Sequence, residues 1–262
     1  MRLRDATVLL MALSLSACAG SGGTKSSALE EPSSRQKAAE LQVQLGQGYL
    51  QQGKLDIARD KLQKALQLDP ESVHANTMLG VLNERIARPE LAEKFYRRAV
   101  ELAPEDGEVN NNLGAFLCGA GRPAEADAWF GKALNDPYYK SPTVALANAG
   151  VCAQKVGNGA RAQDYFRRVL ELQPGNEVAL YELARLNLEA GDYLRASAFQ
   201  QRLESAVSNA PEVLELGATI EAKLGNAKVA ADYRERLKRD FPDYESSYNE
   251  AASRADTGQQ QQ

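Results

Sequence analysis

Two consecutive stretches of 34 residues decide the fold. Residues 73–106 read VHANTMLGVLNERIARPELAEKFYRRAVELAPED, and residues 107–140 read GEVNNNLGAFLCGAGRPAEADAWFGKALNDPYYK. When the two are aligned, small residues fall in register, as Gly80 does with Gly114 and Ala92 with Ala126. Self-similarity at a fixed period of this length is typical of helical repeat proteins. The chain is therefore expected to be a stack of repeated units rather than one or two compact domains.

Three ladders of small residues extend this register along the chain, each with steps of 34, 34, 36, 34 and 34 residues. The first ladder is Gly46, Gly80, Gly114, Gly150, Ala184 and Ala218. The second is Ala58, Ala92, Ala126, Ala162, Ala196 and Ala230. The third is Gly53, Ala87, Gly121, Gly157, Gly191 and Gly225. We expect the first two inside helices that approach each other closely, and the third just after a helix, where a left-handed backbone favours Gly.

Each unit is thus a helix, a tight turn and a second helix, and its residues resemble the tetratricopeptide repeat. Prolines end the second helix in four units, at positions 70, 104, 174 and 242. The predicted fold is an all-α tetratricopeptide-repeat solenoid, a right-handed superhelix of about six repeats. The repeats are framed as 39–72, 73–106, 107–140, 143–176, 177–210 and 211–244. The last two repeats depart from the pattern, because Gln200 and Arg234 stand where a large apolar residue is expected.

Composition argues against nucleic-acid binding and against catalysis. The chain of 262 residues has a formal net charge of -4, without the basic excess typical of nucleic-acid-binding proteins. Its one histidine, His74, has no Cys or His at metal-ligand spacing, and no catalytic motif is present. We therefore expect no enzyme activity, no metal, no cofactor and no small-molecule substrate.

The N-terminus carries an export signal. Arg2 and Arg4 precede a mostly apolar stretch over residues 6–17, which is too short to span a membrane. The stretch ends in Leu15-Ser16-Ala17-Cys18, which resembles the lipobox of bacterial lipoproteins. The resemblance implies a signal peptide over 1–17, a lipid on Cys18 and a flexible tether over 18–38. A plain signal peptide with an incidental cysteine is the alternative.

The residue after Cys18 is Ala19 rather than Asp, which in lipoproteins of this type implies sorting to the outer membrane, facing the periplasm. At the other end of the chain, residues 245–262 are predicted to hold a capping helix and a polar Gln-rich tail.

The remaining cysteines, Cys118 and Cys152, are 34 residues apart, on the first helices of neighbouring repeats. In an exported protein such a pair favours a disulfide. Two free buried thiols are the alternative.

The concave face of such a stack is lined by the first helix of each repeat, and a groove of mixed apolar and amide character suits an extended or helical segment of a partner protein. Asn112 and Asn148 occupy the position where chaperone-binding repeats hold a peptide carboxylate, but the companion lysines are missing. The pairs Arg97-Arg98 and Arg167-Arg168 lie at matching repeat positions and are interpreted as a solvated face. The predicted groove residues are Val43, Gln47, Leu50, Thr77, Met78, Val81, Asn111, Asn112, Ala115, Asn148 and Val151.

The lipobox, the tether and the repeats together resemble the type IV pilus biogenesis lipoproteins, the pilotins. The local match is Asn110-Asn111-Asn112-Leu113-Gly114-Ala115-Phe116-Leu117-Cys118, with Asn135-Asp136-Pro137-Tyr138-Tyr139 and Asn148-Ala149-Gly150-Val151-Cys152. The resemblance implies a non-enzymatic scaffold that binds secretin subunits and other pilus-assembly proteins. It would promote multimerisation of the secretin in the outer membrane, and so pilus formation and twitching motility. A lipoprotein of another envelope assembly, such as a tight-adherence pilus, or an activator of a peptidoglycan synthase is the alternative.

Overall fold

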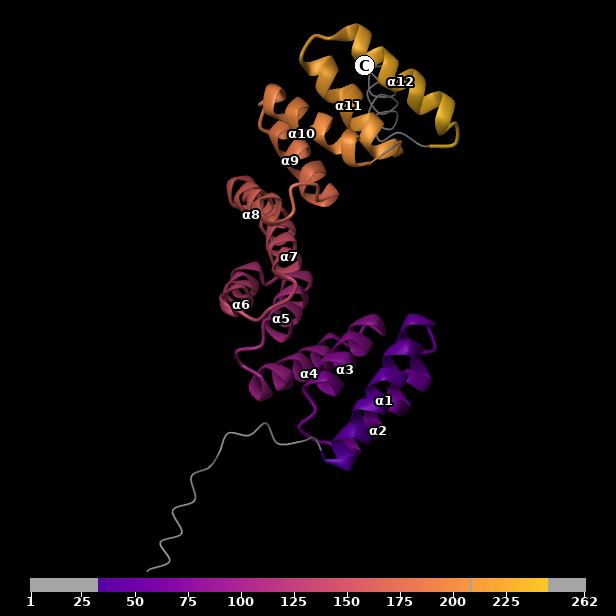
Figure 1. Ribbon diagram of the computed structural model, residues 1–262, viewed down its shortest axis with the longest axis vertical. Coiled ribbons are helices and arrows are strands. Elements are labelled where there is room, and N and C mark those ends of the chain that lie inside the picture. Colours follow the sequence, from indigo (N-terminus) through magenta and orange to yellow (C-terminus); the bar gives the residue numbers. More distant parts are fainter. Residues whose placement is uncertain (1–32, 208, 245–262) are drawn as a thin grey trace, which may run out of the picture.

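The computed structural model describes residues 33–207 and 209–244, and all regular secondary structure within them is α-helical. Figure 1 shows an elongated, curved stack with the first and last helices at opposite ends. In chain order the helices are α1 (Ser34–Gln51), α2 (Leu55–Leu68), α3 (Val73–Arg85), α4 (Pro89–Leu102), α5 (Gly107–Gly119), α6 (Pro123–Asn135), α7 (Pro142–Lys155), α8 (Gly159–Leu172), α9 (Glu177–Glu189), α10 (Tyr193–Ala206), α11 (Pro211–Lys223) and α12 (Ala227–Asp240).

These helices form six consecutive hairpins, from α1 with α2 to α11 with α12. Each helix packs mainly on the other helix of its hairpin. It packs less extensively on the hairpins next to it in the chain. The expected all-α stack of about six tetratricopeptide repeats is confirmed. Because the contacts run mainly between neighbouring hairpins, the buried hydrophobic residues of the described part of the chain form four clusters along the stack rather than one central core.

The turn inside each hairpin has the same backbone form. Gly121 has φ +75°, and the next residue, Arg122, donates its backbone N–H to the carbonyl oxygen of Leu117 at 2.9 Å. This pattern closes the C-terminus of a helix through one left-handed residue. All six members of the third ladder have positive φ, and Ala87 adopts it with a side chain, at φ +54°.

Close approach within a hairpin requires the glycines of the first ladder. A Cβ added at Gly80 would lie 2.7 Å from the ring of Tyr96, and one at Gly114 would lie 2.8 Å from the ring of Phe130. Phe130 is fully buried. An aromatic side chain of the second helix therefore packs directly on the bare backbone of the first.

In the sixth repeat, the small residue at the close contact lies one position earlier than the first ladder predicts. The close contact is made by Gly217, where an added Cβ would lie 2.8 Å from Tyr233, and not by Ala218. Tyr233 is buried, whereas the neighbouring Arg234 is exposed. The missing large residue at position 234 is thus replaced by its neighbour.

The fifth repeat fills the same position with a polar side chain. Gln200 is 1% exposed, and its Nε2 donates to the backbone carbonyl oxygen of Val213 in α11 at 2.7 Å. This amide ties the fifth hairpin to the sixth.

The stack begins earlier than the sequence predicted. Helix α1 starts at Ser34, inside the segment expected to be tether, because Ser33 and Gln36 form a reciprocal capping box. The predicted signal peptide, the lipid site Cys18 and the C-terminal segment 245–262 lie outside the described residues.

Candidate functional site

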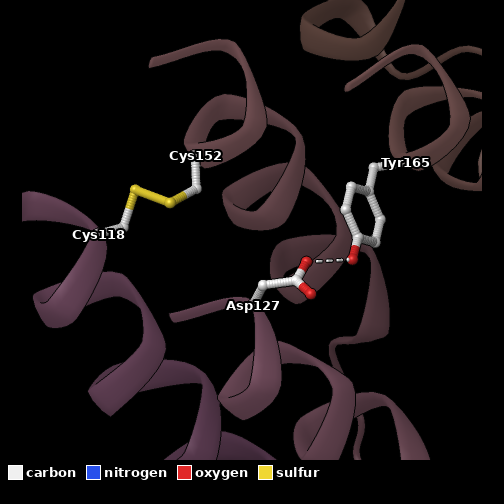
Figure 2. The surroundings of a disulfide bond; sticks show 4 residues. All are labelled: Cys118, Asp127, Cys152 and Tyr165. Carbon is white, nitrogen blue, oxygen red and sulfur yellow. Dashed lines mark hydrogen bonds between the residues drawn. A yellow bond between two sulfur atoms is a disulfide. The ribbon is translucent and has the colours of Figure 1, made fainter. Parts of the chain in front are cut away.

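A disulfide joins Cys118 at the end of α5 to Cys152 at the end of α7 (Figure 2). Their Cα atoms are 5.7 Å apart, and both side chains are buried. The bond links the first helices of the third and fourth repeats, on either side of the junction that holds the two-residue insertion.

The same two helices are also joined by amides. Asn148 in α7 donates its Nδ2 to the Oδ1 of Asn111 in α5 at 3.0 Å. Asn110 has a different role, since its Nδ2 donates to the backbone carbonyl oxygens of Pro104 and Asp106 and so fixes the start of α5. The asparagine run therefore holds one helix end and one helix pair in place.

The structure divides the predicted groove residues by exposure. The side chains of Val43, Leu50, Thr77 and Asn111 are buried. Val43 and Leu50 pack in the core of the first two repeats, and the hydroxyl of Thr77 donates to the backbone carbonyl oxygen of Val73. In this conformation these side chains support the fold and do not face solvent.

The other predicted groove residues reach the surface. Ala115 and Val151 are exposed, at equivalent positions of α5 and α7 near the disulfide. Gln47, Met78, Val81, Asn112 and Asn148 are half-buried. These seven residues remain the predicted groove.

A cavity of about 320 Å³ lies between α6, α7 and the start of α8. Phe130, Ala149, Cys152 and Val156 form part of its apolar wall, so the disulfide lies at its edge. Asp127 and Arg161 supply a polar side.

Those polar groups are held in a fixed arrangement. The hydroxyl of Tyr165 donates to Asp127 Oδ1 at 2.7 Å, as Figure 2 shows, and Arg161 Nη2 lies 2.5 Å from Asp127 Oδ2. Burial raises the pKa of Tyr165, and its hydrogen bond to Asp127 adds to this. The phenol therefore stays neutral at physiological pH and bridges α8 to α6.

Within residues 33–207 and 209–244, no cluster of three or more His, Cys, Asp or Glu side chains could hold a metal ion. The same part of the chain contains no helix long and apolar enough to cross a membrane.

Sequence reasoning missed one surface feature, a cleft between α8 and α10 that contains three arginines, Arg167, Arg195 and Arg202. The repeat register could have indicated this cleft. Glu93 and Glu125, at the junction of the second and third repeats, correspond to the neutral Gln163 and the basic Arg195 at this junction.

Comparison with known proteins identifies the repeats and two relatives. The tetratricopeptide-repeat profile matches residues 43–107 and 153–220. Over 242 residues the chain is 30% identical to the type IV pilus assembly protein PilF of Pseudomonas aeruginosa, covering 92% of this chain and 95% of that protein.

Solved structures give the same result. The crystal structure of PilW, described as a widely conserved type IV pilus biogenesis factor, superposes with a TM-score of 0.72 at 34% identity, covering 79% of this chain and 95% of PilW. The structure of P. aeruginosa PilF also superposes with a TM-score of 0.72, at 29% identity, covering 81% of this chain and 96% of that one.

Proposed function

Because the chain belongs to the family of tetratricopeptide-repeat type IV pilus assembly proteins that includes PilF and PilW, we propose that it is a pilotin. In this role it is a non-enzymatic lipoprotein of the outer membrane, facing the periplasm. It binds secretin subunits and promotes their localisation and multimerisation there, which permits pilus formation and twitching motility. The observation that carries the proposal is the similarity to PilF, which extends over almost the whole of both chains.

The architecture supports a docking role. A solenoid presents a long surface whose shape is set by contacts between neighbouring repeats. In this chain α5 and α7 are locked by the disulfide and by the Asn111–Asn148 hydrogen bond, and the exposed Ala115 and Val151 lie on those two helices. A surface that is already rigid loses little conformational entropy when a partner binds.

The proposed lipid on Cys18 supports the same role. It fixes the scaffold at the membrane where the secretin assembles, which raises the effective concentration of the docking surface. No nucleotide, metal or other cofactor is needed for this function.

The test is deletion of the gene, followed by separation of unboiled envelope proteins on a denaturing gel and detection of the secretin. We expect secretin multimers to be lost, monomers to remain, and twitching motility to fail. Complementation with the wild-type gene restores the multimers and twitching motility. Unchanged multimers and normal piliation in the deletion strain would discard the proposal.

A further inference from the structure

A cleft of about 580 Å³ lies between the second helices of the fourth and fifth repeats, α8 and α10. It is lined by Arg167, Arg195, Ala198, Phe199 and Arg202. Three guanidinium groups thus gather on a chain whose formal net charge is -4. None of these residues belongs to the predicted groove, so the cleft is a second surface beyond the proposed function.

The second and third repeats show what this junction looks like when its charges are balanced. There Glu93, Arg97, Arg122 and Glu125 form a ring between α4 and α6. Arg97 lies 2.7 Å from Glu93 and 2.6 Å from Glu125, and Arg122 lies 2.8 Å from Glu93. Hydrogen bonds from Arg122 to Glu93 and from Arg97 to Glu125 lower the pKa of both carboxyls. Each guanidinium in the ring has two carboxylate partners.

Adding the two repeat steps of 34 and 36 residues gives the positions equivalent to this ring in the fourth and fifth repeats. Its equivalents there are Gln163, Arg167, Asp192 and Arg195. The substitution that matters most is at the position of Glu125, where an arginine, Arg195, now stands. The bridge between Arg97 and Glu125 is replaced by two like charges lining one cleft.

Arg167 and Arg195 each have a partner on their own side of the cleft, and only that of Arg195 is a carboxylate. Arg167 donates its Nη2 to the neutral amide oxygen Oε1 of Gln163 at 2.7 Å. Arg195 lies 3.2 Å from Asp192, the N-cap residue of α10, and 69% of its side chain is exposed. Among the described residues, no carboxylate joins Arg167 to Arg195, whereas the junction of the third and fourth repeats has the pair Asp127–Arg161.

The third arginine is held in position beside an apolar surface. Arg202 Nη2 donates to the backbone carbonyl oxygen of Pro174 at 2.9 Å, and its guanidinium lies 5.7 Å from the centre of the Phe199 ring. Phe199 is half-buried, so the cleft combines a fixed cation with an aromatic floor.

We propose that this cleft binds an acidic segment of a partner protein. A carboxylate of that segment lies between Arg167 and Arg195, and supplies the negative charge that Glu125 brings to Arg97 at the earlier junction. An adjacent apolar side chain packs on Phe199. Guanidinium groups form paired, charge-assisted hydrogen bonds with carboxylates, and two that line one cleft can share one anion. The rest of the chain has an excess of acidic residues and repels an acidic segment, so complementary charge directs such a segment to this cleft.

The test measures binding of a fluorescein-labelled peptide, Glu-Glu-Phe-Glu-Glu, to the full chain in a neutral detergent by fluorescence anisotropy. Its amide counterpart, Gln-Gln-Phe-Gln-Gln, is the control ligand. We expect the acidic peptide to bind about ten-fold more tightly than the amide peptide, with an affinity that falls as salt is added.

Two variants locate the binding. Arg167→Gln with Arg195→Gln is expected to weaken the acidic peptide about ten-fold. Gln163→Glu supplies a carboxylate within the chain where Arg167 already donates, so it should weaken binding without loss of helicity or thermal stability. The matched control, Arg98→Gln with Arg234→Gln, removes the same charge from exposed positions outside the cleft and should leave binding unchanged.

Equal affinity for the two peptides, or equal losses in the cleft and control variants, would overturn the proposal. The proposal would also be overturned if the chain did not bind the acidic peptide but bound phosphatidylglycerol vesicles through Arg167 and Arg195. The cleft would then be a site for anionic lipid. These outcomes are independent of secretin multimerisation, so failure here is distinguishable from failure of the proposed function.

Discussion

Single small residues set the geometry of every hairpin. At Gly114 the absence of a side chain lets Phe130 lie against the helix backbone, and at Gly121 it permits a left-handed turn. Ala87 is the member of the turn ladder that keeps a methyl group, at φ +54°. A Cβ in this region meets the following carbonyl oxygen, so the turn between α3 and α4 is strained.

Replacing Ala87 with Gly should relieve that strain. We expect Ala87→Gly to raise the free energy of unfolding by about 0.5–1 kcal/mol, because the steric relief exceeds the added freedom of the unfolded chain. Equilibrium unfolding in urea measures the change. The control is Ala128→Gly, at an exposed position inside α6, which should lower stability by about 1 kcal/mol. The same sign for both variants would contradict the interpretation.

At the level of helices, α5 and α7 are joined by both a disulfide and a hydrogen bond. The disulfide closes a loop between residues 34 apart in the sequence, and the Asn111–Asn148 hydrogen bond joins the helices nearer their starts. The same two repeats are also joined by the hydrogen bond from Tyr165 to Asp127. The fifth and sixth repeats are joined by packing and by the hydrogen bond from Tyr233 to Glu204. The centre of the stack is thus covalently clamped.

Removing the clamp should weaken the stack measurably. Cys118→Ala with Cys152→Ala is expected to lower the free energy of unfolding by about 2–4 kcal/mol, because the unfolded chain is no longer held in a closed loop. Alanine is chosen since serine would bury hydroxyl groups at both sites.

Unfolding in urea, with and without a reducing agent, provides the control for this prediction. The wild-type chain should lose stability on reduction, and the double variant should be insensitive to it. A wild-type protein isolated from the periplasm with both thiols free in mass spectrometry would contradict an oxidised clamp.

Over the whole molecule, the hairpins follow one another along a curved stack, with α1 at one end and α12 at the other (Figure 1). The proposed lipid on Cys18 precedes α1 in the sequence, so an anchor there holds the stack by its first repeat. Folding of the repeats and attachment to the membrane are then separable properties. The first depends on contacts between hairpins, and the second on one thiol.

Replacing Cys18 with Ala tests that separation. The Cys18→Ala protein should be found in the soluble fraction, with the helical circular dichroism and thermal unfolding of the wild-type repeats. Lipid chains contribute roughly 0.8 kcal/mol for each buried CH₂ group, so their loss removes the anchoring energy. Cell fractionation measures the distribution, with a conservative Ser16→Ala change as the control that keeps the cysteine. Continued membrane retention of Cys18→Ala would contradict the lipid assignment.

The repeat, its period and the turn inside each hairpin could all be predicted from the sequence. These features depend on residues close together in the chain, such as Gly114 with Phe130 and Gly121 with Leu117, so a local pattern records them. The sequence also predicted the Cys118–Cys152 pair, because the repeat places both residues on the first helices of neighbouring repeats.

Which side chains are exposed became clear from the packing of the hairpins. The repeat pattern predicts Val43, Leu50 and Thr77 as groove residues, yet the packing of the first two hairpins buries them. The same packing selects Gly217 over Ala218 and places Arg167 and Arg195 in one cleft without a carboxylate between them. The physical reason is that burial and charge compensation are set by side chains from different hairpins, which a pattern within one repeat does not contain.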